Sequence, residues 1–225
     1  KYLIMKNFFK KLYQLIPFKL YLFNTLKSLF NIPEGVYKHL SFKGIISVNI
    51  EDKKFKLYHF GYMIENEIFW VGIENAFEKI SFNLWTQLSK KSNVIIDIGA
   101  NTGVYSILSN AVNKNAKVYG FEPVERVKKR FEKNINLNNS ASQIKTFSEA
   151  LSNSNGKATI YDSMEDHIYS VTVSKDLSEE NVKTYPVEIN TKRLDTFIEE
   201  QKIEKIDLIK IDVETHEPEV LEGMG

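Results

Sequence analysis

Apolar and polar residues in the middle of the chain follow two alternating patterns. Residues 93–99 form a short, almost continuously apolar run, as expected for a strand covered on both faces of a parallel sheet. Residues 102–113 and 124–139 instead carry apolar residues at helical spacing. Residues 116–123 and 143–151 provide two further strands. This alternation predicts an α/β fold with a doubly wound, Rossmann-like sheet and right-handed crossovers.

Residues 152–225 first depart from this alternation of strands and helices and then return to it. Residues 152–190 contain the stretches "KATIYDS", "YSVTVS" and "TYPVEIN", which predict strands or an excursion over the sheet. Residues 193–201 then predict a short helix and residues 205–214 a fourth parallel strand. A last helix is expected to begin near Pro218, because proline is favoured in the first helical turn.

The N-terminal part shows a different organisation. Residues 42–71 alternate between apolar and polar positions and predict two or three short antiparallel strands. A helix is expected over residues 75–91, with one apolar stripe made of Phe77, Ile80, Leu84 and Leu88. We therefore expect a helical extension over residues 1–35, small strands and a helix over residues 36–90, and a catalytic core over residues 91–225.

The N-terminal extension is basic and aromatic. Residues 1–33 contain six lysines and no acidic residue, and their apolar residues recur at helical spacing with a break at Pro17. Two interpretations are open. The segment could form two helices packed on the core, or a basic amphipathic surface that touches an anionic membrane or a partner. A membrane-spanning helix is not expected, because lysines and Pro17 interrupt every window of about 20 residues.

Composition narrows the classes of function. The chain has 225 residues, 43% of them hydrophobic, and a formal net charge of +1, so it can bury a substantial core. It contains no cysteine, which excludes disulfides, zinc fingers and thiol chemistry within this sequence. The near-neutral charge gives no basic footprint for nucleic acid, and we expect no nucleic-acid partner. We expect a cytoplasmic protein, with any membrane contact peripheral and at the inner face.

The first chemical signal is the turn "DIGANTG" after the first parallel strand. In an open α/β sheet such a turn lies in the ligand crevice beyond the carboxyl ends of the strands. A dinucleotide fingerprint requires glycine at three positions, but Asn101 occupies the second of them. Asp97, which precedes Gly99, would repel a pyrophosphate and suit a ligand with ammonium and sulfonium groups. S-adenosylmethionine is such a ligand, and an NAD-dependent oxidoreductase is the disfavoured alternative.

A second acidic residue ends the next strand. Glu122 lies 23 residues after Gly99, where an acid can accept hydrogen bonds from two ribose hydroxyls. This arrangement serves NAD and S-adenosylmethionine equally well. Glu122 therefore predicts a nucleoside ligand without choosing between them.

Four motifs in this order, "IDIGANTGVYS", "GFEP", "RLDTFI" and "IDLIKIDVETHEPEVLEG", resemble the FkbM family of S-adenosylmethionine-dependent methyltransferases. The resemblance covers residues 90–225 and implies O-methylation, often of sugars in glycans or natural products. It assigns the cofactor to eight residues: Asp97, Gly99, Ala100, Asn101 and Gly103 around the methionyl part, Glu122 at the ribose, and Glu149 and Ala150 at the adenine. The family's usual glycine after "DVE" is Thr215 here.

The fourth predicted strand carries the candidate catalytic residues Asp212, Glu214 and His216. In an extended segment these three side chains would share one side with Lys210. Methyl transfer to oxygen requires an aligned acceptor and a group that takes its proton, and these three residues are the candidates. Two alternatives are open. Lys210 and Asp212 could form a structural ion pair, or the three side chains could hold a divalent ion, although we assign no metal.

The sequence therefore predicts an S-adenosylmethionine-dependent O-methyltransferase whose acceptor is a hydroxyl of a sugar, a glycan or a related small molecule. A sheet of the type that the resemblance implies would continue after residue 225, so its last strands are expected to be missing from this sequence. The alternative is a cofactor-binding module without turnover of its own. The sequence does not fix the acceptor or the oligomeric state.

Overall fold

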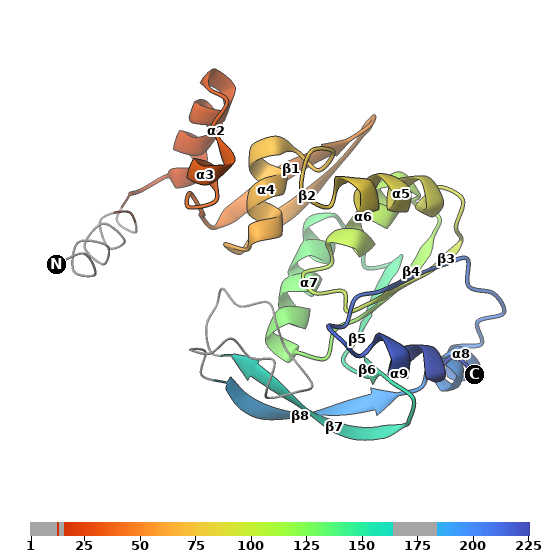
Figure 1. Ribbon diagram of the computed structural model, residues 1–225. Helices are drawn as coiled ribbons and strands as arrows, with labels where there is room; N and C mark the ends of the chain where they lie inside the picture. The colour runs from red at the N-terminus through yellow and green to blue at the C-terminus, as the bar shows by residue number, and fades with distance from the viewer. Residues whose placement is uncertain (1–12, 14–15, 164–183) are drawn as a thin grey trace.

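The computed structural model describes residue 13, residues 16–163 and residues 184–225 (Figure 1). Its centre is a four-stranded parallel sheet in the order β5-β4-β3-β9. The strands are β3 (Val94–Ile98), β4 (Lys117–Phe121), β5 (Ile144–Phe147) and β9 (Leu208–Ile211). From β3 the chain runs outward to β4 and β5 and later returns to β9 on the other side of β3. The predicted parallel sheet is confirmed, and β3 lies at the point where the strand order reverses.

Helices cover both faces of this sheet, as the predicted doubly wound arrangement requires. α6 (Val104–Val112) and α7 (Glu125–Leu137) share one core with Ile95 and Val118 of the sheet. α8 (Leu194–Gln201) and α9 (Glu217–Glu222) share a second core, which contains Ile96, Ile98, Tyr119, Phe121, Phe197 and Val220. Neighbouring residues of β3 therefore point to opposite cores, because side chains alternate along a strand.

A small third sheet lies over the end of the core. It has the order β6-β8-β7 and consists of β6 (Ala150–Leu151), β7 (Gly156–Ser163) and β8 (Thr184–Lys192). β7 and β8 pair antiparallel along the lower edge of the molecule in Figure 1. Strands predicted for "KATIYDS" and "TYPVEIN" are confirmed. The stretch "YSVTVS" lies outside the described residues.

The N-terminal part contains the predicted helices and antiparallel strands. α2 (Lys19–Leu29) and α3 (Glu34–Tyr37) precede a hairpin of β1 (Gly44–Ile50) and β2 (Lys53–His59). The alternative of a third strand is wrong, because α4 (Met63–Val71) follows the hairpin. Glu65 starts this helix by accepting hydrogen bonds from the backbone N–H groups of Phe60 (3.0 Å) and Tyr62 (3.2 Å). Among the described residues, no helix has the length and apolar character needed to cross a membrane.

α5 (Lys79–Ser89) packs with a different face from the predicted stripe. Phe82 and Trp85 are buried, and the Trp85 indole N–H donates a hydrogen bond of 2.7 Å to the Ser109 hydroxyl of α6. The four residues of the predicted stripe are exposed instead: Phe77, Ile80, Leu84 and Leu88. The spacing predicted the helix, but the face that packs on the fold is the one with Phe82 and Trp85.

Candidate cofactor and acceptor site

The glycine turn after β3 lies against the end of β9. Gly99 has a φ of 72°, and a Cβ atom there would clash with the Asp212 carbonyl oxygen. The backbone N–H groups of Gly99 and Ala100 both donate to the Phe121 carbonyl, at 3.1 and 2.9 Å. Only glycine combines this backbone conformation with so close an approach to a neighbouring strand. The turn is thereby fixed between the carboxyl ends of β4 and β9.

Gly103 has a packing role in this turn. Its φ of 79° starts α6, and a Cβ atom there would overlap the Phe131 ring of α7. Phe131 is fully buried, and the same ring lies against Gly120 of β4. Gly103 therefore lets α7 approach the turn closely and does not line the cavity described next.

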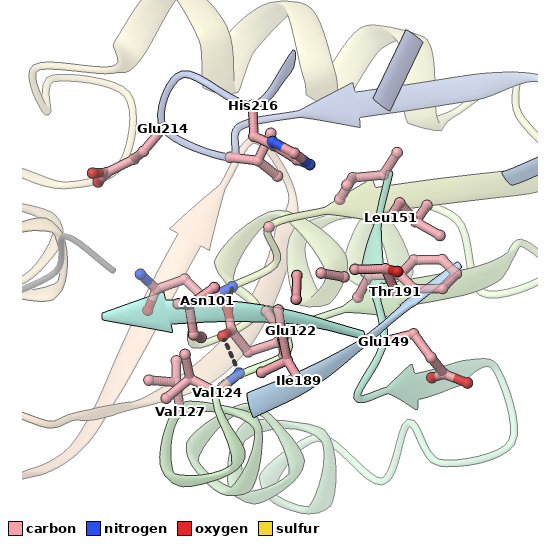
Figure 2. Close-up of a pocket in the computed structure, with 18 of the residues that line it drawn as sticks. Asn101, Glu122, Val124, Val127, Glu149, Leu151, Ile189, Thr191, Glu214 and His216 are labelled. Atoms are coloured by element: carbon pink, nitrogen blue, oxygen red, sulfur yellow. Dashed lines mark hydrogen bonds between the residues drawn. The ribbon is translucent and has the colours of Figure 1, made fainter. Parts of the chain in front are cut away.

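A cavity of about 170 Å³ lies beyond the carboxyl ends of β3, β4 and β9 and is bounded on the far side by β7 and β8 (Figure 2). It brings together most of the predicted site. Five of the assigned cofactor residues line it: Gly99, Asn101, Glu122, Glu149 and Ala150. All three candidate catalytic residues line it as well: Asp212, Glu214 and His216. Asp97 and Ala100, like Gly103, lie outside its wall.

Asp97 lies beneath the turn, on the side of α6. Its side chain is fully buried, accepts a hydrogen bond of 2.7 Å from the Ser106 hydroxyl and lies 3.8 Å from the Lys210 ammonium. Because Ile96 and Ile98 face the other core, Asp97 must point toward α6. Its carboxylate does not line the cavity, and its predicted place beside the methionyl part of the cofactor stays a prediction.

Glu122 holds the turn from the cavity side. Its carboxylate accepts one hydrogen bond from the Asn101 N–H and one from the Val124 N–H, both 3.0 Å long. Burial raises the pKa of Glu122 to about 7. The carboxylate connects the glycine turn to the start of α7 and reaches the cavity between them (Figure 2).

The cavity wall is acidic. Its described lining residues include the carboxylates of Glu122, Glu149, Asp212 and Glu214 and contain no lysine or arginine. Two of these carboxylates have a lysine close by, because Lys192 lies 3.6 Å from Glu149 and Lys210 lies 3.1 Å from Asp212. Burial, followed by the neighbouring charges of Asp212 and Glu217, raises the pKa of Glu214 above its ordinary value. Negative charge in a partly enclosed site favours a cationic ligand and opposes a phosphate.

The segment after β9 departs from the predicted alternation. Leu208 faces one core and Ile209 and Ile211 the other, but the strand ends at Ile211. Glu214 and Thr215 then have φ values of 47° and 74°, so the prediction that Asp212, Glu214 and His216 share one strand side is wrong. A positive φ is strained for a β-branched residue, which accounts physically for the glycine that the family resemblance leads us to expect at position 215.

His216 immediately precedes α9 and contacts Ser152, the residue that follows β6. Its Nε2 lies 3.1 Å from the Ser152 hydroxyl, and its Nδ1 lies 3.4 Å from a Glu219 carboxylate oxygen. Within the described residues, no group of three acidic or histidine side chains converges in a way that could hold a metal ion. The divalent-ion alternative therefore gains no support from the geometry.

The predicted ion pair of Lys210 is present. The Lys210 ammonium lies 3.1 Å from a carboxylate oxygen of Asp212, besides its approach to Asp97, and 4.9 Å from the centre of the Tyr105 ring. The Asp212 side chain is largely exposed and also lines the cavity, so the ion pair and a role toward a ligand are compatible.

The apolar half of the cavity wall was missed by the sequence analysis. Besides residues at the ends of the central strands, it comes from the start of α7 and from one face of the β7–β8 hairpin, through Val124, Val127, Ala158, Ile160 and Ile189, with Thr191 beside them. The spacing of two between Ala158 and Ile160, and between Ile189 and Thr191, was the available signal, because it marks one face of each strand.

Arg126 joins α7 to the same hairpin. Its guanidinium makes two hydrogen bonds to the Asp162 carboxylate, one of them 2.9 Å long. Asp162 is almost completely buried and also accepts a hydrogen bond from the Tyr185 hydroxyl at 3.1 Å. The hairpin is therefore anchored to the helix that follows the Glu122 strand.

Comparison with known proteins finds relatives that are named methyltransferases. The chain is 29% identical over 154 residues to the methyltransferase sdnD of Sordaria araneosa, an alignment that covers 58% of this chain and 60% of that protein. It is 27% identical over 155 residues to the 2-O-methyltransferase NoeI of Sinorhizobium fredii, covering 64% of this chain and 63% of that protein. The chain thus spans less than two thirds of the length of these relatives.

Among solved structures, an S-adenosylmethionine-dependent methyltransferase from Agrobacterium tumefaciens aligns with a TM-score of 0.35 and 11% identity, over 49% of this chain and 34% of that one. Residues 97–225 match the methyltransferase FkbM domain. This match extends over more than half of the sequence, from Asp97 through α9, and the chain belongs to the FkbM family of methyltransferases.

Proposed function

We propose that the protein transfers a methyl group from S-adenosylmethionine to a hydroxyl oxygen of a sugar, a glycan or a related small molecule. Membership of a methyltransferase family implies S-adenosylmethionine as the cosubstrate. The observation that carries the proposal is the acidic cavity, whose described wall has four carboxylate residues and no lysine or arginine. Such a wall suits a nucleoside that carries positive charge and no phosphate.

The polar residues of the wall have distinct proposed roles. Glu122 accepts hydrogen bonds from the ribose hydroxyls, and the apolar face formed by Val124, Ile160 and Ile189 provides the contact surface for the adenine, beside Glu149 and Ala150. The turn at Gly99 and Asn101 borders the methionyl part. The negative wall favours both the ammonium and the sulfonium.

The chemistry that the bound cosubstrate supplies is an electrophilic methyl group on a sulfonium sulfur. The acceptor oxygen forms a bond to this carbon as the carbon–sulfur bond breaks, and the hydroxyl proton must leave. Asp212, Glu214 and His216 line the same cavity and are the candidates to align the hydroxyl and take its proton. Asp212 is the preferred base, because its side chain lines the cavity and is largely exposed to an incoming acceptor.

A hydroxyl acceptor is supported by one relative whose name describes a 2-O-methyltransferase. Two measurements test the proposal. Calorimetric titration compares S-adenosylhomocysteine with NAD, and tighter binding of NAD would overturn the cofactor assignment. Transfer of a labelled methyl group to a panel of glycans then tests turnover. Binding of S-adenosylhomocysteine without transfer to any acceptor would instead support the alternative of a binding module.

A further inference from the structure

A largely enclosed lysine lies between the support of the glycine turn and the proposed base. Lys210 of β9 is paired with Asp97 of β3 in the parallel register of the sheet. Leu208, two residues earlier, packs on the core that α6 covers, so the Lys210 side chain also points toward α6. This side chain is 14% exposed. A lysine so enclosed requires charged partners, because burial of an unpaired charge is costly.

The Lys210 ammonium lies between two carboxylates and an aromatic ring. It is 3.8 Å from Asp97 Oδ1, a buried oxygen with no hydrogen-bond partner among the described residues. It is 3.1 Å from Asp212 Oδ2 and 4.9 Å from the centre of the Tyr105 ring. The Tyr105 hydroxyl donates a hydrogen bond of 2.6 Å to Glu78, which fixes the ring. The ammonium is therefore held in one place, unlike that of an ordinary surface ion pair.

Asp212 has a fixed backbone and a side chain whose orientation depends on Lys210. The Asp212 N–H donates to the Ile98 carbonyl at 3.1 Å. The Asp212 side chain is 63% exposed, and the described partner of its carboxylate is Lys210. Asp212 lines the cavity, whereas Lys210 does not. We therefore expect Lys210 to influence a ligand through Asp212 and not by direct contact.

The direction of this carboxylate matters for methyl transfer. As the acceptor oxygen bonds to the methyl carbon and the carbon–sulfur bond breaks, the bonding electron pair returns to sulfur and the hydroxyl proton passes to Asp212. The positive charge on sulfur therefore decreases on the way to the transition state. A carboxylate turned toward the sulfonium would stabilise the bound cosubstrate more than the transition state, and the step would be slower.

We propose that Lys210 is a positioning residue, which keeps the Asp212 carboxylate directed to the acceptor hydroxyl and away from the sulfonium. The assignment rests on the proposed function, in which Asp212 is the base. Asp97 and the Tyr105 ring hold the ammonium, and the ammonium holds Asp212 by a hydrogen bond and by its charge. Without the ammonium, the exposed carboxylate is free to turn toward the positive charge of the bound cosubstrate.

The readout is the preference for S-adenosylmethionine over S-adenosylhomocysteine, measured by calorimetry as the ratio of the two dissociation constants. The two ligands differ by the methyl group and the sulfonium charge, so a loosened turn that weakens both equally leaves this ratio unchanged. We expect Lys210→Gln to raise the preference about fivefold, because the freed Asp212 carboxylate approaches the sulfonium. Lys210→Arg keeps the positive charge and should stay within about twofold of the original protein.

The chain supplies a matched control in Lys128. Its side chain is 16% exposed, and its ammonium lies 3.0 Å from the Glu132 carboxylate, one helical turn away on α7. Lys128→Gln removes an ion pair of similar enclosure in which neither partner lines the cavity. The preference between the two ligands should not change in this variant. An equal change in Lys128→Gln and Lys210→Gln would overturn the proposal.

A double-mutant cycle tests whether Lys210 acts through Asp212. When Asp212→Asn has removed the carboxylate, adding Lys210→Gln should change the preference by less than about twofold. An equal rise with and without the Asp212 carboxylate would show a general effect of charge and overturn the positioning role. If Lys210→Gln unfolds at the assay temperature, Lys210→Met is combined with Asp97→Asn and compared with Asp97→Asn alone. In that pair, loss of Lys210 leaves no unbalanced charge at Asp97.

The outcomes distinguish this assignment from the proposed function. Tighter binding of NAD than of S-adenosylhomocysteine by the original protein would overturn both. If the original protein binds S-adenosylhomocysteine more tightly than NAD, an unchanged preference in a folded Lys210→Gln overturns only the role of Lys210. Loss of both ligands by that folded variant would do the same, because Lys210 would then support the glycine turn through Asp97. With a glycan that accepts the methyl group, kcat of Lys210→Gln should fall about tenfold, with partial recovery in Lys210→Arg.

Discussion

Asp97 and Asp212 flank the same lysine but face different surroundings. Asp97 is fully buried beneath the glycine turn, whereas Asp212 is exposed at the cavity. We expect Asp97→Ala to abolish measurable binding of S-adenosylhomocysteine, because it removes the acceptor of the Ser106 hydroxyl and unbalances Lys210 beneath the turn. We expect Asp212→Ala to keep most of this binding and to lower turnover roughly 100-fold or more, as loss of a general base does.

Calorimetry and methyl-transfer rates on the two variants check this contrast. Asp97→Asn is a control with a side chain of nearly the same volume. It keeps an oxygen that can accept the hydrogen bond from Ser106 but removes the negative charge. The reverse ranking, with binding lost in Asp212→Ala and turnover lost in Asp97→Ala, would show that the two roles are exchanged.

We expect Glu122 to make binding of the cosubstrate dependent on pH. Burial raises its pKa to about 7, so the folded protein holds this proton over a range in which the unfolded chain has already lost it. The contribution of Glu122 to stability therefore falls as pH rises from its ordinary pKa toward 7 and is constant above that. Ionised Glu122 is the better acceptor for ribose hydroxyls and the better partner for a cation, so affinity should rise as pH increases through about 7.

Titration of S-adenosylmethionine at several pH values on either side of 7 measures this dependence. Glu122→Gln should bind more weakly and show no rise in affinity in that range, because the amide does not titrate. Burial also raises the pKa of Glu65 to about 8, but Glu65 lies in the N-terminal part and is the same in the original protein and in Glu122→Gln. An unaltered pH profile in Glu122→Gln would assign the dependence to another group.

At the scale of elements, α7 connects the N-terminal hairpin to the glycine turn. Asn134 is buried, accepts a hydrogen bond from the Tyr58 N–H of β2 (2.7 Å) and donates to the Thr102 carbonyl of the turn (2.8 Å). Asn138, one helical turn later, makes similar bonds to the Lys56 backbone of β2, 2.7 and 2.8 Å long. Only the first of the two asparagines reaches the turn.

This difference predicts that Asn134 positions the turn. We expect Asn134→Ala to weaken S-adenosylhomocysteine binding about tenfold, because the unpaired Thr102 carbonyl lets the turn move. Asn138→Ala should lower stability and leave that affinity within about twofold, since it loses its bonds to the Lys56 backbone and to the Asn134 carbonyl but none to the turn. Calorimetry together with thermal unfolding separates the two effects. Equal loss of affinity in both variants would mean that α7 acts only through overall stability.

The elements show which parts of the fold the sequence could predict. Residues 93–99 are apolar enough to be recognised as a covered strand, and Gly99 marks the turn that follows. The prediction of a possible third strand at residues 63–71 was wrong, because their short alternation of apolar and polar residues resembles a strand. In the structure the Glu65 carboxylate accepts hydrogen bonds from the backbone N–H groups just before this segment, and this contact starts a helix. Periodicity does not contain this capping contact, and it likewise could not show that Trp85 would determine the buried face of α5.

At the scale of the molecule, the proposed cofactor site joins the glycine turn, the region of Glu122, the sheet of β6, β7 and β8, and the segment after β9. The glycine turn, Glu122 and the segment after β9 could be predicted, because parallel strands bring their carboxyl ends to one edge of a sheet. For residues 152–190 the sequence predicted strands or an excursion over the sheet, but nothing in either strand specifies that Ile160 and Ile189 form a wall of this cavity. The position of Asp97 under the turn depends likewise on the packing of α6 and β9.

The Arg126–Asp162 pair holds that wall in place and gives the last prediction. Asp162 is almost fully buried, so Arg126→Leu leaves a carboxylate without its guanidinium partner. We expect the free energy of unfolding to fall by about 2–4 kcal/mol, because an unbalanced buried charge costs more than a lost surface pair. Binding of S-adenosylhomocysteine should weaken as well, since the hairpin forms the apolar side of its cavity.

The double variant Arg126→Leu with Asp162→Leu distinguishes charge from packing. If the cost comes from the stranded carboxylate, removing it should restore much of the stability that the single variant loses, as replacing a whole buried pair often does. Tyr185 then loses one acceptor, which limits the recovery. Denaturant unfolding of the two variants measures the difference. A double variant as unstable as the single one would show that Arg126 acts through its packing, and that the hairpin is held by its apolar face alone.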